Sequence, residues 1–91
     1  MATEKTNYNK SSVEKLPNDK PAVYRIETEG GRSNYVGVAK RGRVQERIQE
    51  HIGTIPGASV KIEQTDSIQQ ARDKEARIIK QSQPKYNKQG K

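Results

Sequence analysis

The sequence predicts one small α+β domain in which a three-stranded antiparallel sheet is flanked by helices. Three observations predict it: two strand-like segments around a Gly-Gly pair, a third alternating segment, and two segments with helical spacing. The chain has 91 residues, enough for one compact core. The expected order is β-β-α-β-α, followed by a short C-terminal segment.

The opening of the chain is expected to be a flexible polar arm. Residues 1–20 show neither helical nor strand periodicity, and Pro17 and Pro21 disfavour helix at the residues before them. Only 29% of the residues are hydrophobic and none is Phe or Trp, so the core should be small and aliphatic. We therefore expect an arm at 1–20 and the folded domain at 21–91.

A β-hairpin is expected next. Residues 22–28 are rich in strand formers and alternate after Val23, and residues 34–38 alternate again. Between them, residues 29–33 contain the Gly-Gly pair and are typical of a turn. Two short strands around such a turn predict a hairpin.

A short amphipathic helix is expected over residues 43–52. Its apolar residues recur at every fourth position, at Val44, Ile48 and Ile52. Gly53 follows, where a helix would end.

A third strand and a longer helix complete the predicted fold. Residues 58–63 alternate as a strand after the break at Pro56-Gly57. Residues 67–70 have the form of a helix-capping box, and the helix should continue to about residue 81, before Pro84. The apolar stripe of this helix consists of Ile68, Ala71, Ile78 and Ile79.

The charge of the chain favours a polyanionic partner. Eighteen Lys and Arg residues against eleven Asp and Glu give a net charge of +7, and binding to phosphates would release counterions. Four cations crowd one stretch: Lys40, Arg41, Arg43 and Arg47. Charge alone leaves solubility or RNA binding of the ribosomal kind open.

Composition also excludes several classes of protein. The chain has no Cys, which excludes disulfide frameworks and zinc fingers and suits a reducing compartment. No apolar run approaches the roughly 18 residues of a membrane span. We therefore expect a cytoplasmic protein with no membrane partner.

Glu75 is the first residue that packing alone does not explain. At about 100° per residue it falls near the middle of the apolar stripe of the longer helix. A carboxylate there needs a cation, a metal or strong hydrogen-bond donors. The alternatives are that the face opens at its edge, or that Glu75 pairs with an arginine.

Arg47 and His51 are the second unusual feature. They are four residues apart and so leave the same side of the short helix, beside its apolar stripe. With Glu46 and Glu50 they could equally form a solvated charge array, and a lone His beside an apolar face is more often structural than catalytic.

The tyrosines are the third. Tyr24 and Tyr35 lie on the two arms of the predicted hairpin, and Tyr86 adjoins Asn87 near the C-terminus. Tyrosines usually serve packing. A core that retains Tyr and contains no Phe or Trp indicates that the hydroxyl itself is needed.

Taken in order, these residues resemble the signature of the GIY-YIG nuclease family, in which two tyrosine-bearing strand motifs precede a helical arginine, a glutamate and an asparagine. The matching positions are Ala22-Val23-Tyr24, Tyr35-Val36-Gly37, Arg47 with His51, Glu75, and Asn87. The resemblance spans residues 17–88 and is strongest to the nuclease domain of the bacterial nucleotide-excision-repair incision subunit. Two positions depart from the family: Ala22 where Gly is usual, and Val38 where those relatives often have Lys.

The resemblance implies a role for each of these residues. Glu75 would hold one divalent cation, Mg²⁺ or Mn²⁺, and Arg47 would bind the scissile phosphate. A tyrosine would activate the water, Tyr35 being favoured over Tyr24, with His51 as its hydrogen-bond partner or as an alternative base. Asn87 would orient its neighbours. The backbone of DNA would be held by Lys40, Arg41 and Arg43, together with Arg47.

The predicted function is therefore that of a metal-dependent DNA endonuclease with low intrinsic sequence specificity, which a partner protein or a dimer would supplement. Two alternatives stay open. The chain could be a non-catalytic nucleic-acid-binding module derived from the same fold, or a domain whose basic surface docks on an acidic protein.

Overall fold

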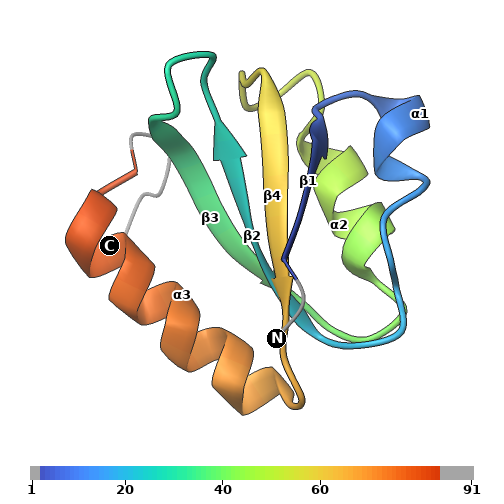
Figure 1. The fold of residues 1–91 in the computed structure, drawn as a ribbon, viewed down its shortest axis with the longest axis vertical. Helices are drawn as coiled ribbons and strands as arrows, with labels where there is room; N and C mark the ends of the chain where they lie inside the picture. The colour runs from blue at the N-terminus through green and yellow to red at the C-terminus, as the bar shows by residue number, and fades with distance from the viewer. Residues whose placement is uncertain (1–2, 85–91) are drawn as a thin grey trace.

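Four strands and three helices follow one another along residues 3–84, the part of the chain that the computed structural model describes (Figure 1). They are β1 (Thr3–Asn7), α1 (Lys10–Val13), β2 (Ala22–Glu27), β3 (Ser33–Ala39), α2 (Val44–His51), β4 (Ser59–Gln64) and α3 (Ile68–Ser82). From β2 onward the order is the β-β-α-β-α that the sequence predicts. Two elements precede it.

The sheet has four strands, so the expectation of three is wrong. Its order is β1-β4-β2-β3, and all neighbouring strands are antiparallel. The additional strand, β1, pairs with β4 from Thr3↔Glu63 to Asn7↔Ser59. A strand at the edge of a sheet is held by backbone hydrogen bonds and needs no apolar face, so its polar sequence carries no alternation by which it could be recognised.

The rest of the expected arm is also packed against the domain. Asn9 caps α1, since its side chain accepts a hydrogen bond of 2.8 Å from the backbone N–H of Ser12. Val13 and Leu16 are buried, at 0% and 5% exposure, in the main core. A helix of four residues is too short to show a period. Residues 3–16 are therefore part of the folded domain and do not form a loose arm.

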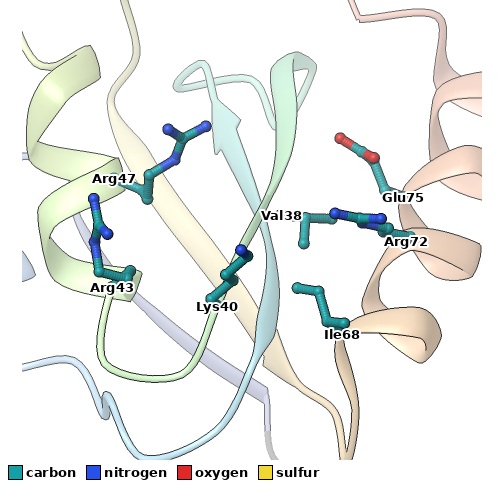
Figure 2. Close-up of a pocket in the computed structure, with 7 residues that line it drawn as sticks. All are labelled: Val38, Lys40, Arg43, Arg47, Ile68, Arg72 and Glu75. Atoms are coloured by element: carbon teal, nitrogen blue, oxygen red, sulfur yellow. The ribbon is translucent and has the colours of Figure 1, made fainter.

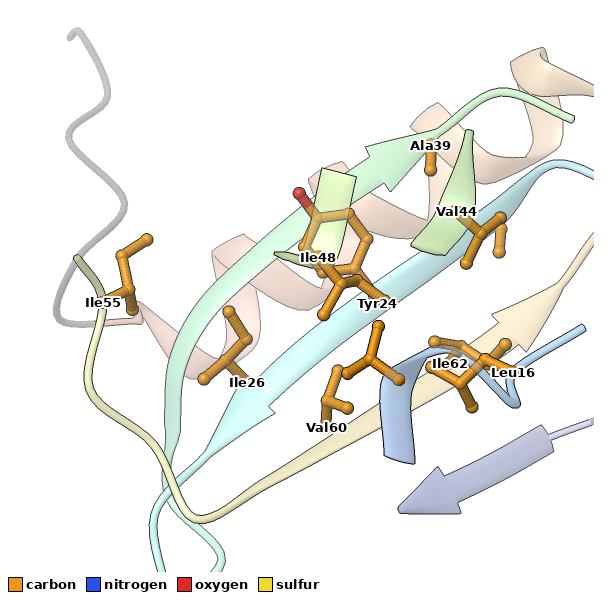
Figure 3. Close-up of a cluster of buried hydrophobic side chains, with 11 residues drawn as sticks. Leu16, Tyr24, Ile26, Ala39, Val44, Ile48, Ile55, Val60 and Ile62 are labelled. Carbon is orange, nitrogen blue, oxygen red and sulfur yellow. The ribbon is translucent and has the colours of Figure 1, made fainter. Parts of the chain in front are cut away.

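The helices cover opposite faces of the sheet, α3 on one side and α1 with α2 on the other (Figure 1). Successive side chains along β2 point to opposite faces of the sheet. Tyr24 and Ile26 belong to the core under α2, and Val23 lies beside Ile78 of α3. The buried cluster on the α2 side is drawn in Figure 3 and contains Val13, Leu16, Ala22, Tyr24, Ile26, Ala39, Val44, Ile48, Ile55, Val60 and Ile62.

The helix ends lie close to where the sequence predicts them. Ser67 caps α3 by accepting a hydrogen bond of 3.2 Å from the backbone N–H of Gln70. Gly53 follows α2 with a φ of 90°, a conformation that favours glycine just beyond a helix end. Within residues 3–84, no helix has the length and apolar character of a membrane span.

The packing of the N-terminal segment can be tested by replacing Leu16 with Ala. We expect the free energy of unfolding to fall by about 2–4 kcal/mol, because the change leaves a cavity in the core. Urea unfolding would measure it. The control is Lys15→Ala, at an exposed neighbouring position, which should change stability by less than about 0.5 kcal/mol. Equal effects of the two changes would contradict the packing described above.

Candidate active site

Tyr24 and Tyr35 lie on adjacent strands and both face α2. Their ring centroids are 6.1 Å apart. Tyr24 is fully buried, whereas Tyr35 is only partly buried. Gly37 stands opposite Tyr24 in the β2–β3 register. A Cβ at Gly37 would lie 2.5 Å from the Tyr24 hydroxyl oxygen and 3.0 Å from Cε2 of Tyr35. Glycine is therefore required at this position to make room for the two tyrosine rings.

His51, at the end of α2, completes a cluster of three rings. Its Nε2 lies 2.9 Å from the Tyr24 hydroxyl, and its ring centroid is 4.6 Å from that of Tyr35. Burial lowers the pKa of His51, the positive charge of Arg47 lowers it further, and Glu50 opposes the change. The imidazole is therefore neutral near neutral pH and can accept a proton.

The surroundings of Tyr24 keep its hydroxyl protonated. Burial raises the pKa of Tyr24 well above its ordinary value, and Tyr35 raises it further, while Arg47 acts in the opposite direction. A protonated hydroxyl at this distance can donate a hydrogen bond to Nε2 of the neutral imidazole. Tyr24 is thus suited to holding His51 in place and poorly suited to acting as a base.

Helix α2, which carries Arg47 and His51, is fixed at its start by the preceding loop. The side-chain oxygen of Asn18 accepts a hydrogen bond of 2.8 Å from the backbone N–H of Val44. The backbone oxygen of Leu16 accepts one of 2.7 Å from Gln45. Both contacts come from the segment that was expected to be flexible, so this segment helps to position the site.

An open groove of about 440 Å³ runs beside the ring cluster. It is lined by Val38, Lys40, Arg43, Arg47, Ile68, Arg72 and Glu75 (Figure 2). One bank is formed by α2 and the loop before it, and the other by α3. Between the banks lies β3, the last strand of the sheet. Because β3 is the outermost strand among the described residues, residues from both faces of the sheet reach the same groove.

Glu75 enters the groove from the α3 bank, and Arg47 faces it from α2 (Figure 2). Burial raises the pKa of the half-buried Glu75 carboxyl, and the nearby charge of Arg72 opposes the rise. Glu75 forms no ion pair within residues 3–84. The arginine pairing that the sequence left open is therefore absent from the described part of the chain.

The described residues contain no group of three or more His, Cys, Asp or Glu side chains that could enclose a metal ion. A single carboxylate facing an open groove fits a cation that keeps several water ligands and takes others from a substrate phosphate. Mg²⁺ behaves in this way. The donor set therefore fits one weakly held divalent cation at Glu75.

The cations on α2 are partly engaged with acidic neighbours. Arg43 pairs with Glu46 at 2.8 Å, whereas Arg47 and Glu50 are 3.8 Å apart, with both side chains about half exposed, at 45% and 52%. An exposed pair at this distance contributes little to stability. The solvated array considered from the sequence is thus present, but it leaves the Arg47 guanidinium available to a phosphate.

The structure brings most of the candidate residues together. Lys40, Arg43, Arg47 and Glu75 line the groove, and Tyr24, Tyr35 and His51 form the adjoining ring cluster. Arg47 joins the two groups, because it lines the groove and its charge acts on both Tyr24 and His51. Arg41 is exposed on the loop before α2 and is not part of the groove lining, and Asn87 lies outside the described residues.

Two contributors were missed. Gly37 was part of the motif, but its steric role was not recognised; its place opposite Tyr24 in the hairpin register could have revealed it. Arg72 was overlooked, although its spacing of three residues from Glu75 places both on one helix face.

The first departure from the family pattern causes no conflict. Ala22 is buried in β2 and is not among the residues with positive φ, so its methyl group is tolerated.

Comparison with solved structures identifies the fold. The GIY-YIG N-terminal endonuclease domain of UvrC from Thermotoga maritima, bound to magnesium as its catalytic divalent cation, matches with a TM-score of 0.66 and 25% identity over 82% of this chain and 94% of that one. A variant of the same domain with one tyrosine replaced by phenylalanine, also bound to its catalytic divalent cation, matches with the same score and identity over 82% and 93%. No family model and no curated protein sequence matches the chain. The predicted resemblance to GIY-YIG endonuclease domains is confirmed at the level of the fold.

The steric requirement at Gly37 predicts that Gly37→Ala is destabilising. The added methyl group would displace the Tyr24 ring and should lower the free energy of unfolding by about 1–3 kcal/mol. Urea unfolding provides the measurement. Gly30→Ala is the matched control, because a Cβ there would meet only the Thr28 hydroxyl oxygen, at 3.9 Å. If the Gly37 variant were as stable as the Gly30 variant, the steric argument would be wrong.

The lowered pKa of His51 predicts a dependence of stability on pH. The unfolded chain, in which His has a pKa near 6.5, binds the proton more readily than the folded state. The contribution of neutral His51 to the free energy of unfolding is therefore complete above about pH 6.5. It is lost as the pH falls toward the lower pKa that His51 has in the folded state. Urea unfolding at pH 8 and pH 5 should show that the free energy of unfolding falls more for the wild type than for His51→Gln. Identical losses would rule out His51 as the source.

Proposed function

We propose that the protein is a metal-dependent DNA endonuclease that hydrolyses phosphodiester bonds with low intrinsic sequence specificity. The observation that carries the proposal is the placement of the Glu75 carboxylate and the Arg47 guanidinium on opposite banks of one groove, beside the cluster of Tyr24, Tyr35 and His51. The likeness to an endonuclease domain bound to magnesium supports the same chemistry.

Hydrolysis of a phosphodiester requires an activated water, neutralisation of the charge on the phosphoryl oxygens, and stabilisation of the leaving oxygen. Glu75 is the residue that would hold the divalent cation. When bound, this cation supplies positive charge to the phosphate and to the leaving oxygen. Mg²⁺ is our first choice, because it is the cation of the solved neighbour; Mn²⁺ is the alternative expected from the sequence.

Arg47 binds the scissile phosphate from the opposite bank. Its planar guanidinium can donate two parallel hydrogen bonds to phosphate oxygens, an arrangement that a lysine ammonium does not reproduce. Arg47 is about half exposed and only weakly paired with Glu50, so donors of its guanidinium remain available to the substrate. Its charge also favours the anionic form of any group that deprotonates nearby.

For activation of the water we favour Tyr35 over Tyr24. Tyr24 is fully buried and its hydroxyl contacts His51, so it acts as a positioning residue. Tyr35 is more accessible, and its ring lies against that of His51. His51, neutral near pH 7, serves as the hydrogen-bond partner of the tyrosine or as the alternative base.

Lys40, Arg41 and Arg43 hold the DNA backbone on the α2 side. Contacts with phosphates position a duplex and carry no direct information about its sequence. The intrinsic sequence specificity of the protein is therefore low, and a partner protein or a dimer would supply additional specificity. Asn87 keeps its proposed orienting role. A function in DNA repair, in the cytoplasm, is part of the proposal and rests on the likeness to UvrC and on composition.

The proposal predicts that the purified protein relaxes supercoiled plasmid in the presence of Mg²⁺ or Mn²⁺, and that EDTA abolishes the activity. Glu75→Gln should lower the rate by at least about a hundredfold, because its amide is a weak ligand for a hard cation. Agarose gel electrophoresis of the plasmid over time gives the rates.

Glu14→Gln is the matched control, since Glu14 is exposed beside α1 and lies outside the groove. It should cut at the wild-type rate. A wild-type protein that shifts the plasmid on a gel but leaves it uncut with both metals would favour the non-catalytic binding module. If Glu75→Gln kept its activity, Glu75 would not be the metal ligand.

A further inference from the structure

Arg72 is a cation of the groove that the mechanism above does not use. It lies on α3, three residues before Glu75, and its side chain extends toward Val38 on the edge strand (Figure 2). Ile68 and Glu75 line the groove from the same helix. Among the described residues that line the groove, Arg72 is thus the cation of the α3 bank, whereas Lys40, Arg43 and Arg47 belong to the opposite bank.

The guanidinium of Arg72 forms no ion pair within 4 Å in the described part of the chain, although its charge acts on Glu75 over a longer distance. Arg43 and Arg47 each have a glutamate of α2 within 4 Å. Arg72 forms no ion pair between residues 3 and 84, not even with Glu75. The apolar side chains of Val38 and Ile68 beside it offer no hydrogen-bond acceptor. A guanidinium has five N–H donors, so those of Arg72 are available to a ligand in the groove.

The position of Arg72 indicates which part of a substrate it meets. Residues three apart on a helix have Cβ atoms about 5–6 Å from one another, so Arg72 lies one helical turn from Glu75. A phosphate held between Glu75 and Arg47 would therefore lie about one helical turn away from Arg72. The next phosphate of the same strand is the group that a guanidinium at this place would reach.

We propose that Arg72 binds the phosphate adjacent to the cleaved bond, so that the groove holds the DNA backbone from both banks. This inference rests on the proposed function for the identity of the substrate. It assigns Arg72 to substrate binding and gives it no part in the chemical step. The guanidinium approaches from the side of Val38, where the edge strand itself contributes no charge.

The test is binding of a short fluorescent DNA duplex by Arg72→Gln, measured by anisotropy in EDTA between 50 and 200 mM salt. We expect affinity to fall by about tenfold, as for one hydrogen-bonded ionic contact. The slope of log affinity against log salt should become smaller by about one. With metal present, KM should rise while kcat changes by less than about twofold. Arg72→Lys should recover most of the salt slope and part of the affinity.

Arg77→Gln is the matched control, since Arg77 is exposed on the same helix but does not line the groove. It removes the same charge and should change affinity by less than about twofold. Equal losses in the two variants would show a general effect of net charge and overturn the proposal. A fall in kcat at unchanged affinity would also overturn it, because Arg72 would then act through Glu75.

Binding in EDTA separates this inference from the endonuclease proposal. If the wild type binds DNA without cutting it and Arg72→Gln loses affinity as expected, the endonuclease proposal fails while the phosphate contact stands. If the wild type cuts and Arg72→Gln binds with unchanged affinity and salt slope, the assignment of Arg72 fails alone.

Discussion

The contact between the Tyr24 hydroxyl and Nε2 of His51 connects the centre of the sheet to the end of α2, and the geometry of the candidate site depends on it. Tyr24 can lie there because Gly37, opposite it on β3, has no side chain. The contact holds His51 beside Tyr35 at the end of α2. Arg47, one turn earlier on the same helix, lines the groove. Gly37 thus makes room for the tyrosine that contacts the helix carrying Arg47.

The second constraint is the position of β3 as the outermost strand of the sheet in the described part of the chain. In the middle of a sheet, the neighbouring strands keep the side chains of one face apart from those of the other face. At the outermost strand, side chains from the two faces can reach the same place. Arg47 approaches from the α2 face and Glu75 from the α3 face. The edge strand also explains why the groove is open enough for a polymer, whose backbone could pass along it without threading through the protein.

The N-terminal segment contributes more than the sequence indicated. Asn18 binds the first turn of α2, and Val13 and Leu16 fill the core beneath that helix. The apolar residues of this N-terminal segment are too few and too widely spaced to show a period. Strand β1 is polar because an edge strand needs only backbone pairing. Sequence patterns detect elements that bury one face. They do not detect those held by backbone hydrogen bonds and isolated side chains.

The sequence by itself determined the hairpin, both long helices and their caps, because each depends on periodicity and local hydrogen bonding within a few residues, as at Ser67 and Gly53. It also determined the ordered set of Tyr24, Tyr35, Arg47, His51 and Glu75. Only the tertiary structure decided that β1 joins the sheet and that the two banks of the groove meet beside β3. It alone placed Arg72, which forms no ion pair in the described chain, on the bank of Glu75. These features arise from contacts between residues far apart in the chain, which no local pattern records.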